Sequence, residues 1–509
     1  MGIKLTMLIL FFAIMVIVGI YARRHARSVD GFVLGGRSVG PWLTAFAYGT
    51  SYFSAVVFVG YAGQFGWKYG LASTWIGLGN AIIGSLLAWV VLGRRTKVMT
   101  QHLKSKTMPD FFGSRYGSKS LTIAASAIVF IFLVPYTASI YNGLSRLFEM
   151  AFHVPYAWCV VAMAAFTGIY VILGGYMATA INDFIQGIIM LGGIVAVVWA
   201  VLSGQGGFIE AVRKMAAIPS DVEITLGQPG AFTSFFGPDP LNLLGVVILT
   251  SLGTWGLPQM IGKFYAIKDE KSINTGTVIS TIFAVIISGG CYFLGGFGRL
   301  FDSPAIYDET GSVVFDSIIP YMLSSLSDVL IGIVVVLVLS ASMSTLASLV
   351  LTSSSTLTLD FLKGNLLKNA DDKKLVRTMQ VLIVFFIVVS VALALNPPTF
   401  IAQLMGISWG ALAGAFLAPF LYGLYWKRVT KAAVWASFIA GVGITVSNMF
   451  LNYIASPINA GAIAMLAGLV VVPVVSVLTP KPDSEKMDEL FSCYDEKVTI
   501  TKKRSLETR

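Results

Sequence analysis

The chain alternates long apolar stretches with short polar segments, a pattern that predicts a bundle of membrane-spanning helices. About 20 apolar residues in a helix cross the hydrocarbon core of a bilayer, and thirteen stretches approach or exceed that length. They cover residues 3–22, 41–67, 71–92, 121–148, 156–174, 177–202, 241–262, 274–298, 328–355, 376–395, 400–425, 432–452 and 459–478. We therefore expect an all-α integral membrane protein with about thirteen transmembrane helices.

Composition excludes a soluble enzyme. Hydrophobic residues make up 56% of the 509 residues and charged residues only 12%, too few to cover the surface of a soluble protein of this size. The three cysteines and three histidines have no metal-site spacing, and no glycine-rich segment continues into a phosphate-binding lysine motif. We expect no enzymatic activity and no organic cofactor.

Basic residues are distributed unequally between the two sides of the predicted bundle. The segments after odd-numbered spans, together with the C-terminal tail, hold 29 of the 35 Lys and Arg residues. Cytoplasmic loops carry such an excess, which predicts a multi-pass protein of the cell membrane with its N-terminus outside and its C-terminus in the cytoplasm. The formal charge of +10 then reflects topology, and we expect no nucleic-acid partner.

Two predicted spans are interrupted by small, polar or helix-breaking residues. The first interruption covers 47–55 in span 2, and the second covers 253–259 in span 7, where Pro258 removes a backbone N–H. Irregular backbone at membrane depth is tolerated only where it is buried in protein or lines a cavity. Broken helices at matching positions of two halves are typical of transporters built from inverted repeats.

This pattern predicts an organisation around two five-helix repeats, at 41–202 and 241–425. The remaining segments are a peripheral first helix with its loop (1–40), an outer loop (203–240), two peripheral helices (426–478) and a cytoplasmic tail (479–509). The tail is polar and mixed in charge, which predicts a mobile segment.

The densest polar cluster in the apolar part of the chain covers 340–348 in span 9. Helical spacing places Ala341, Ser344, Thr345 and Ser348 near one face. Hydroxyls and freed carbonyls are hard oxygen ligands that suit a small cation. The alternative, in which these hydroxyls bond back to their own helix and help helices pack, stays open.

Asp183 is the acidic residue that the spans place well inside the membrane. An ionisable group at that depth costs roughly 2.5–3.5 kcal/mol, which makes it a functional candidate. A span boundary a few residues away would instead leave Asp183 at the cytoplasmic interface.

Several aromatic and polar residues at or near the interruptions are candidates for solute contact, although helix packing is an alternative role for each. They are Tyr52, Ser54, Tyr136, Ser139, Trp255 and Gln259. The pattern places no Arg or Lys at mid-depth, with Lys263 near the inner end of span 7. A solute with several carboxylates would leave buried charge uncompensated, so we expect a compact monocarboxylate or a zwitterionic amino acid. A sugar stays open as an alternative, because the sequence shows no decisive charge.

Five motifs together resemble the sodium:solute symporter family. They cover 34–38, 49–54, 109–112, 174–186 and 341–345. The resemblance implies a ten-helix core formed by spans 2–11. It also implies a sodium site made of the Thr50, Phe53 and Ala341 carbonyls and the Ser344 and Thr345 hydroxyls.

In some relatives, the resemblance implies a second sodium site. The matching residues here are Asp183, Ser344 and Ser348, whereas Ala347 lacks the hydroxyl found in those relatives. The chain also departs from the proline-type members, which have an acidic residue at the position of Tyr52, so proline is disfavoured as the solute. The stretches 255–258 and 68–71 are more similar to the pantothenate and monocarboxylate branch, and this resemblance implies a pantothenate-like acid or a monocarboxylate.

We therefore expect sodium-coupled import of a small organic solute by alternating access. The expected partners are the solute, sodium as the coupling ion and the lipid bilayer, and a single chain should be functional. Two alternatives stay open: a proton-coupled symporter of the same fold that uses Asp183, and a membrane protein that senses a solute without transporting it.

Overall fold

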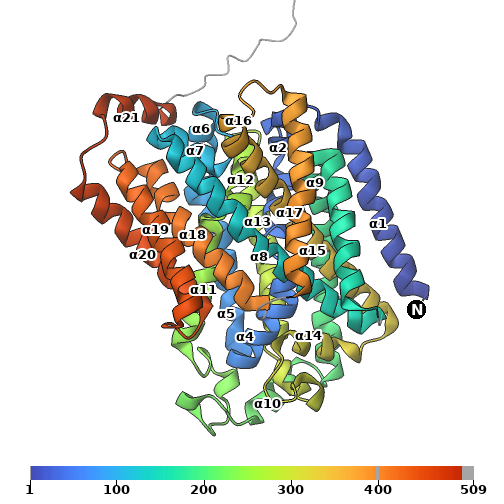
Figure 1. Cartoon of the computed structure of the whole chain (residues 1–509). Coiled ribbons are helices and arrows are strands. Elements are labelled where there is room, and N and C mark those ends of the chain that lie inside the picture. The colour runs from blue at the N-terminus through green and yellow to red at the C-terminus, as the bar shows by residue number, and fades with distance from the viewer. Residues whose placement is uncertain (1, 153, 397–400, 496–509) are drawn as a thin grey trace, which may run out of the picture.

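The computed structural model describes residues 2–152, 154–396 and 401–495, which form a bundle of long helices running along a shared direction (Figure 1). Eleven helical segments among the described residues are long and apolar enough to cross a membrane. No strand occurs in these ranges. The all-α class is therefore confirmed, whereas the exact count of thirteen spans stays a prediction.

Nine helices of more than 20 residues form most of the bundle. They are α1 (Gly2–Ala22), α8 (Lys119–Phe152), α9 (Tyr156–Gly204), α13 (Glu270–Gly295), α15 (Asp328–Thr356), α17 (Asp372–Leu395), α18 (Ile401–Tyr425), α19 (Lys431–Leu451) and α20 (Pro457–Leu478). A further helical run over 74–102 begins as α5 (Thr74–Gly79) and ends as α6 (Arg94–His102). Shorter helices include α2 (Val29–Leu34), α7 (Met108–Tyr116), α10 (Phe208–Ala217), α14 (Phe315–Ser324) and α16 (Lys363–Asn365).

Both predicted interruptions are confirmed. Helix α3 (Pro41–Thr50) ends at Thr50, residues 51–54 are not helical, and the helix resumes and continues into α4 (Ala62–Tyr69). In the second case α11 (Pro240–Leu252) gives way to a tight turn at Gly253–Trp255, and α12 (Pro258–Ala266) starts afresh. Pro258 occupies the first position of α12, where its missing N–H removes no helical hydrogen bond.

Helix α9 contains a sharp break at Gly175. Its 49 residues would extend about 74 Å as one straight helix, more than twice the hydrocarbon thickness of a bilayer. Gly175 has φ 54° and ψ −143°, a conformation that residues with a Cβ rarely adopt. The break supports the predicted division into two spans at 156–174 and 177–202.

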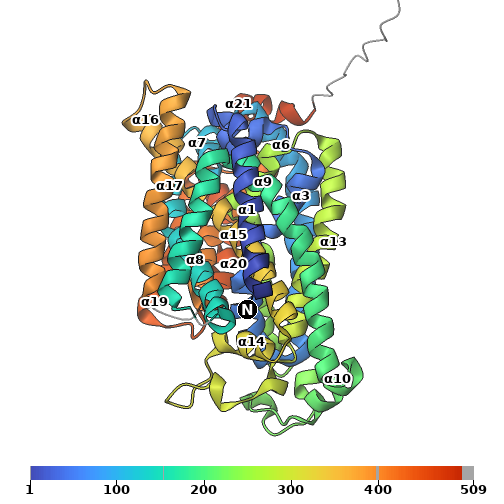
Figure 2. The ribbon, with the colours of Figure 1, turned by 90° about the vertical axis from the view of Figure 1, so that its right-hand side faces the viewer.

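The share of residues buried inside the protein distinguishes the central helices from the outer ones. In the most apolar window of each helix, 89% of the residues in α18 and 83% of those in α15 are buried inside the protein, against 22% in α1. Helices α1 and α20 lie at opposite edges of the bundle (Figures 1 and 2). The core is therefore built around α15 and α18, while the division into two inverted repeats stays a prediction.

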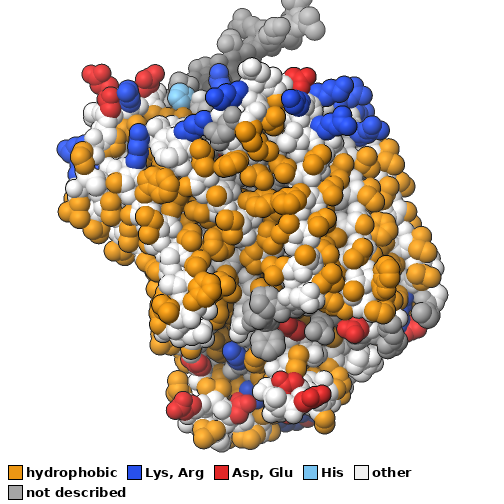
Figure 3. Space-filling view, in the orientation of Figure 1, with side chains coloured by type: hydrophobic (Ala, Val, Ile, Leu, Met, Phe, Trp, Pro, Cys, Tyr) orange, Lys and Arg blue, Asp and Glu red, His pale blue; other side chains and the backbone are white. Residues whose placement is uncertain are grey.

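The surface carries an apolar belt with charged ends. Figure 3 shows hydrophobic side chains over the middle of the bundle and Lys and Arg gathered at the end that holds α6, α7 and α16. The described chain begins nearer the opposite end, whereas α21 (Ser484–Phe491) lies at the basic end (Figure 1).

The expectation of a mobile tail is wrong for 484–494, which fold onto the basic end. Lys427 pairs with Asp488 at 2.6 Å, and the Arg115 guanidinium lies 5.2 Å from the centre of the Phe491 ring. Phe491 and Cys493 are buried. Charge composition missed this helix because its stability depends on apolar side chains that only the folded bundle covers. Residues 496–509 lie outside the described ranges.

The Gly175 break generates a stability prediction. In Gly175→Ala the new Cβ would lie 2.7 Å from the Phe32 carbonyl oxygen at a positive φ, so we expect a loss of about 1–3 kcal/mol. Gly192→Ala in the same helix is the matched control, because its Cβ meets no atom within 4 Å. Thermal unfolding of the purified proteins measures both. If Gly175→Ala were as stable as the unmodified protein, or more stable, the claim that position 175 requires glycine would be wrong.

Candidate functional site

Four oxygen atoms meet where α15 passes the break after α3. The Ser344 Oγ donates to the Thr50 carbonyl at 3.0 Å, and the Thr345 Oγ1 donates to the same carbonyl at 3.1 Å. Both hydroxyls also lie 3.0 Å from the Ala341 carbonyl. All four residues are buried. The structure thus brings together four of the five residues predicted to hold sodium.

The α15 hydroxyls were predicted either to bind a cation or to bond back to their own helix, and their geometry is compatible with both. Ser344 and Thr345 do bond back to carbonyls four residues earlier, at Ser340 and Ala341. They also reach across to Thr50, whose carbonyl is free because α3 ends there. Packing and ligand geometry therefore coexist in the same side chains.

Phe53, the fifth predicted sodium residue, lies in the same break. Its ring is buried, 4.3 Å from the ring of Tyr52 and 6.3 Å from that of Phe283 between ring centres. These contacts position the backbone of the break, while the role of the Phe53 carbonyl stays a prediction.

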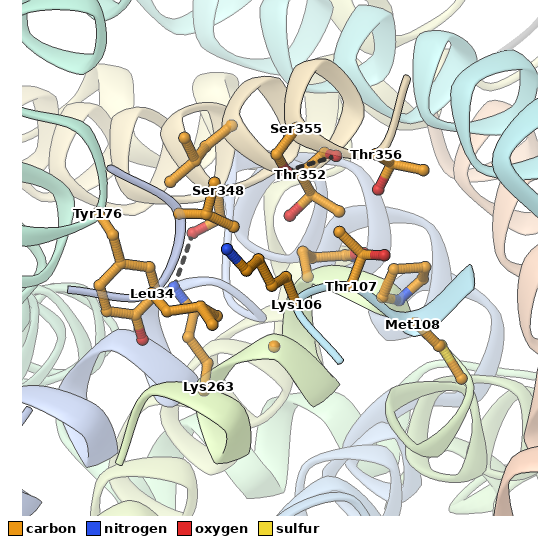
Figure 4. Close-up of a pocket in the computed structure, with 15 residues that line it drawn as sticks. Leu34, Lys106, Thr107, Met108, Tyr176, Lys263, Ser348, Thr352, Ser355 and Thr356 are labelled. Atoms are coloured by element: carbon orange, nitrogen blue, oxygen red, sulfur yellow. Dashed lines mark hydrogen bonds between the residues drawn. The ribbon is translucent and has the colours of Figure 1, made fainter. Parts of the chain in front are cut away.

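A second polar group surrounds Asp183, which is fully buried within the protein in α9. The Lys263 Nζ lies 3.8 Å from the Asp183 Oδ2 and donates to the Ser348 Oγ at 3.0 Å (Figure 4). Ser348 shares a further hydrogen bond of 2.7 Å with Ser51 in the first break. Helices α9, α12 and α15 therefore meet the first break around one buried ion pair.

The sequence pattern places Lys263 near the inner end of span 7, and the structure adds that its side chain is buried within the protein. Its side chain is only 4% exposed. The sequence signal was present, because Lys263 lies only five residues after Pro258 in an interrupted span. The sequence pattern does not show that α12 packs against α15, and this packing buries the Lys263 ammonium.

Trp409 of α18 connects the two breaks and was not selected from the sequence. Its ring stacks on Tyr52 at 5.6 Å and meets Tyr136 edge-on at 5.8 Å between ring centres. A Cβ on Gly253 would lie 2.6 Å from the Trp409 ring, so the second break packs closely against it. Tyr52 in turn donates to the Thr250 carbonyl at 2.5 Å, which ties the first break to α11.

Two polar atoms of this aromatic group have no hydrogen-bond partner among the described residues. They are the Tyr136 hydroxyl and the Trp409 Nε1, and both residues are fully buried. Buried polar groups without partners are rare in native proteins and mark places where a water or a ligand belongs. We take the Tyr52, Tyr136 and Trp409 rings as the centre of the candidate solute site.

The other predicted solute residues divide between structural and open roles. Ser139 donates to the Tyr136 carbonyl at 2.6 Å in its own helix, and Trp255 donates to the Ile83 carbonyl at 2.9 Å. Ser54 accepts from the Val56 N–H at 3.2 Å where the helix resumes. Gln259 is buried, and both polar atoms of its amide lack partners among the described residues.

A narrow pocket leads from the basic end of the bundle to the ion pair. Its lining includes Tyr176, Gln259, Lys263, Ser348 and Thr352, and near its mouth Thr107 from the segment before α7 (Figure 4). Gln259 therefore faces this pocket, on a different side of the second break from the group around Trp409.

Two curated relatives match nearly the full chain. The osmoregulated proline transporter OpuE of Bacillus subtilis is 28% identical over 489 residues, covering 93% of this chain and 94% of the relative. The sodium/proline symporter of Escherichia coli is also 28% identical, over 440 residues and 84% of each chain.

Solved structures share the fold, and a family model matches the sequence. A Na⁺-coupled sialic acid symporter in a substrate-bound, outward-open state superposes with a TM-score of 0.74 at 15% identity, covering 94% of this chain and 99% of the other. A nucleobase-cation-symport-1 family transporter gives a TM-score of 0.53 at 14% identity, covering 91% and 98%. The model of the sodium:solute symporter family matches residues 32–441, so this chain belongs to that family of multi-pass membrane transporters.

Proposed function

We propose that the chain imports a small organic solute together with sodium by alternating access. The observation that carries this proposal is the oxygen cluster of Thr50, Ala341, Ser344 and Thr345, built on an interrupted helix inside the bundle. Neutral oxygen ligands suit a monovalent cation, because the ion brings a single positive charge into a site with no charge of its own.

The cluster also supplies a mechanism for coupling. The Ser344 and Thr345 hydroxyls donate to the Thr50 carbonyl, so these three oxygens join α3 to α15. A sodium ion bound by the same three oxygens would hold α3 to α15 through the ion. Tyr52 and Ser54 lie two and four residues after Thr50, so sodium binding would order the backbone that contacts the solute.

The driving force is sufficient for concentrative uptake. One sodium ion that crosses about 100 mV with a tenfold gradient supplies roughly 3.7 kcal/mol, enough for about a 500-fold gradient of a neutral solute. An anionic solute carried with one sodium ion would forgo the electrical part. Coupling to one sodium ion therefore favours a neutral or zwitterionic solute, because one net positive charge then crosses the membrane and gains energy from the potential.

For the solute we propose a compact monocarboxylate, a pantothenate-like acid or an amino acid. The site around Trp409 has aromatic walls and unpartnered Tyr136 hydroxyl and Trp409 indole N–H donors, and Lys263 is already paired with Asp183. A single carboxylate can use these donors, whereas a second one would remain uncompensated. The curated relatives that carry proline support the amino-acid option.

The first prediction tests the sodium site in proteoliposomes. Ser344→Ala and Thr345→Ala should each raise the sodium concentration for half-maximal uptake, because loss of one ligand costs about 1–3 kcal/mol, or roughly 5- to 150-fold. Ser354→Ala is the matched control, since its hydroxyl donates only to the Leu351 carbonyl of its own helix. If the sodium concentration for half-maximal uptake is unchanged in both variants, Ser344 and Thr345 are not sodium ligands.

The same assay separates the alternatives. A sodium gradient should drive uptake at equal pH on both sides, whereas a proton gradient without sodium should not. Uptake that follows only the proton gradient would instead support coupling through Asp183, and binding without uptake would support a sensor.

The second prediction concerns solute class. In sodium buffer, a monocarboxylate or an amino acid should raise the thermal unfolding temperature of the purified protein, since a ligand at 100 times its Kd adds about 2.7 kcal/mol of stability. The shift should shrink in choline buffer. Stabilisation by succinate or citrate, with none by monocarboxylates or amino acids, would overturn this solute assignment.

The third prediction concerns orientation, for which we propose an outer N-terminus and a cytoplasmic C-terminus. The native cysteines are buried, so single added cysteines report their own side. In intact cells a membrane-impermeant maleimide should label Glu309→Cys, on an exposed loop near α14, and should label Lys373→Cys only after lysis. The reverse labelling pattern would invert the proposed topology.

A further inference from the structure

The Asp183 carboxylate is a buried charge that needs a cation. It is fully buried, and neither of its oxygens accepts a hydrogen bond within the described part of the chain. A carboxylate in an apolar interior is stable only beside a compensating charge. The nearest basic group is the Lys263 ammonium, 3.8 Å from the Oδ2.

The ammonium has the surroundings expected for a bound monovalent cation. It donates to the Ser348 Oγ at 3.0 Å and lies 5.2 Å from the centre of the Tyr176 ring. Ser348 also shares a hydrogen bond of 2.7 Å with Ser51, the residue after Thr50 of the oxygen cluster. Carboxylate, hydroxyl and aromatic face therefore surround one positive charge that is covalently attached to the chain. Figure 4 shows the Lys263, Ser348 and Tyr176 side chains of this group.

We propose that the Lys263 ammonium is the resident cation of the Asp183 site and occupies the place that a second sodium ion would need. This inference rests on the proposed sodium coupling and specifies it as one sodium ion per solute, bound at Thr50, Ala341, Ser344 and Thr345. A further ion beside Asp183 would have to displace the ammonium, since two cations in that space repel each other.

A tethered cation differs from a sodium ion in what it does during the cycle. Lys263 belongs to α12, so its charge moves with that helix and is not released to either side. Through Ser348 it connects α12 to α15, and through Ser51 to the first break. Lys263 therefore positions the sodium site and neutralises Asp183 without adding a transported ion.

Removing the side chain should create the second site. The pocket from the basic end reaches Lys263 and Ser348, so in Lys263→Ala the vacated space is open to solvent and ions. Asp183, Ser348 and Ser51 would then present oxygens and an uncompensated negative charge to sodium. We expect this variant to bind a second sodium ion.

The test is equilibrium binding of radioactive sodium to the purified full chain in choline buffer, without solute. We expect one ion per chain for the wild type and two for Lys263→Ala. The double variant Asp183→Asn/Lys263→Ala should return to one, because the extra negative charge is gone. Lys268→Ala, whose side chain is exposed, is the matched control and should stay at one.

The wild-type count tests the inference even if the variants fail to fold, which thermal unfolding checks. Lys263→Ser provides a second variant that also removes the ammonium and vacates its space, and its sodium activation curve should become sigmoidal. Two ions on the wild type, or one ion on well-folded Lys263→Ala, would overturn the inference alone. Failure of the wild type to bind sodium would overturn the proposed function as well.

Discussion

Inside a bilayer, a backbone carbonyl that leaves its helix must find a partner within the protein. The end of α3 at Thr50 creates such a carbonyl in the centre of the bundle. The Ser344 and Thr345 hydroxyls of α15 satisfy it, so α15 must pass close to the break and must be buried on most of its surface. The same constraint that stabilises the break also produces a cluster of oxygens that a cation can use.

The two interruptions are held together by different physical interactions. A hydrogen bond from Tyr52 to the Thr250 carbonyl and the packing of Trp409 against Gly253 join them on one side. On the other side, the ion pair of Lys263 with Asp183 and the chain of hydroxyls through Ser348 join them electrostatically. The two breaks are therefore joined by contacts on both sides.

The pairing of Asp183 with Lys263 explains how two ionisable groups can be buried inside the bundle. Either charge alone would be expensive in an apolar interior, whereas the pair has no net charge and each member has further contacts. The candidate solute site around Trp409 contains polar donors without formal charge, namely the Tyr136 hydroxyl and the Trp409 indole N–H. The buried charges lie at the separate group of Asp183 and Lys263.

The membrane bundle, the two broken helices and the Ala341, Ser344 and Thr345 part of the oxygen cluster could be predicted from the sequence pattern, whereas Thr50 was assigned from the family resemblance. These features are local: apolar runs, Pro258, small residues and hydroxyls three or four positions apart are all visible along one segment. The folded structure was needed to show that Lys263 pairs with Asp183, that Trp409 connects the breaks and that 484–494 fold onto the basic end. Each of these depends on which helix packs against which, because a side chain's partner is chosen by distances between segments that lie far apart in the chain.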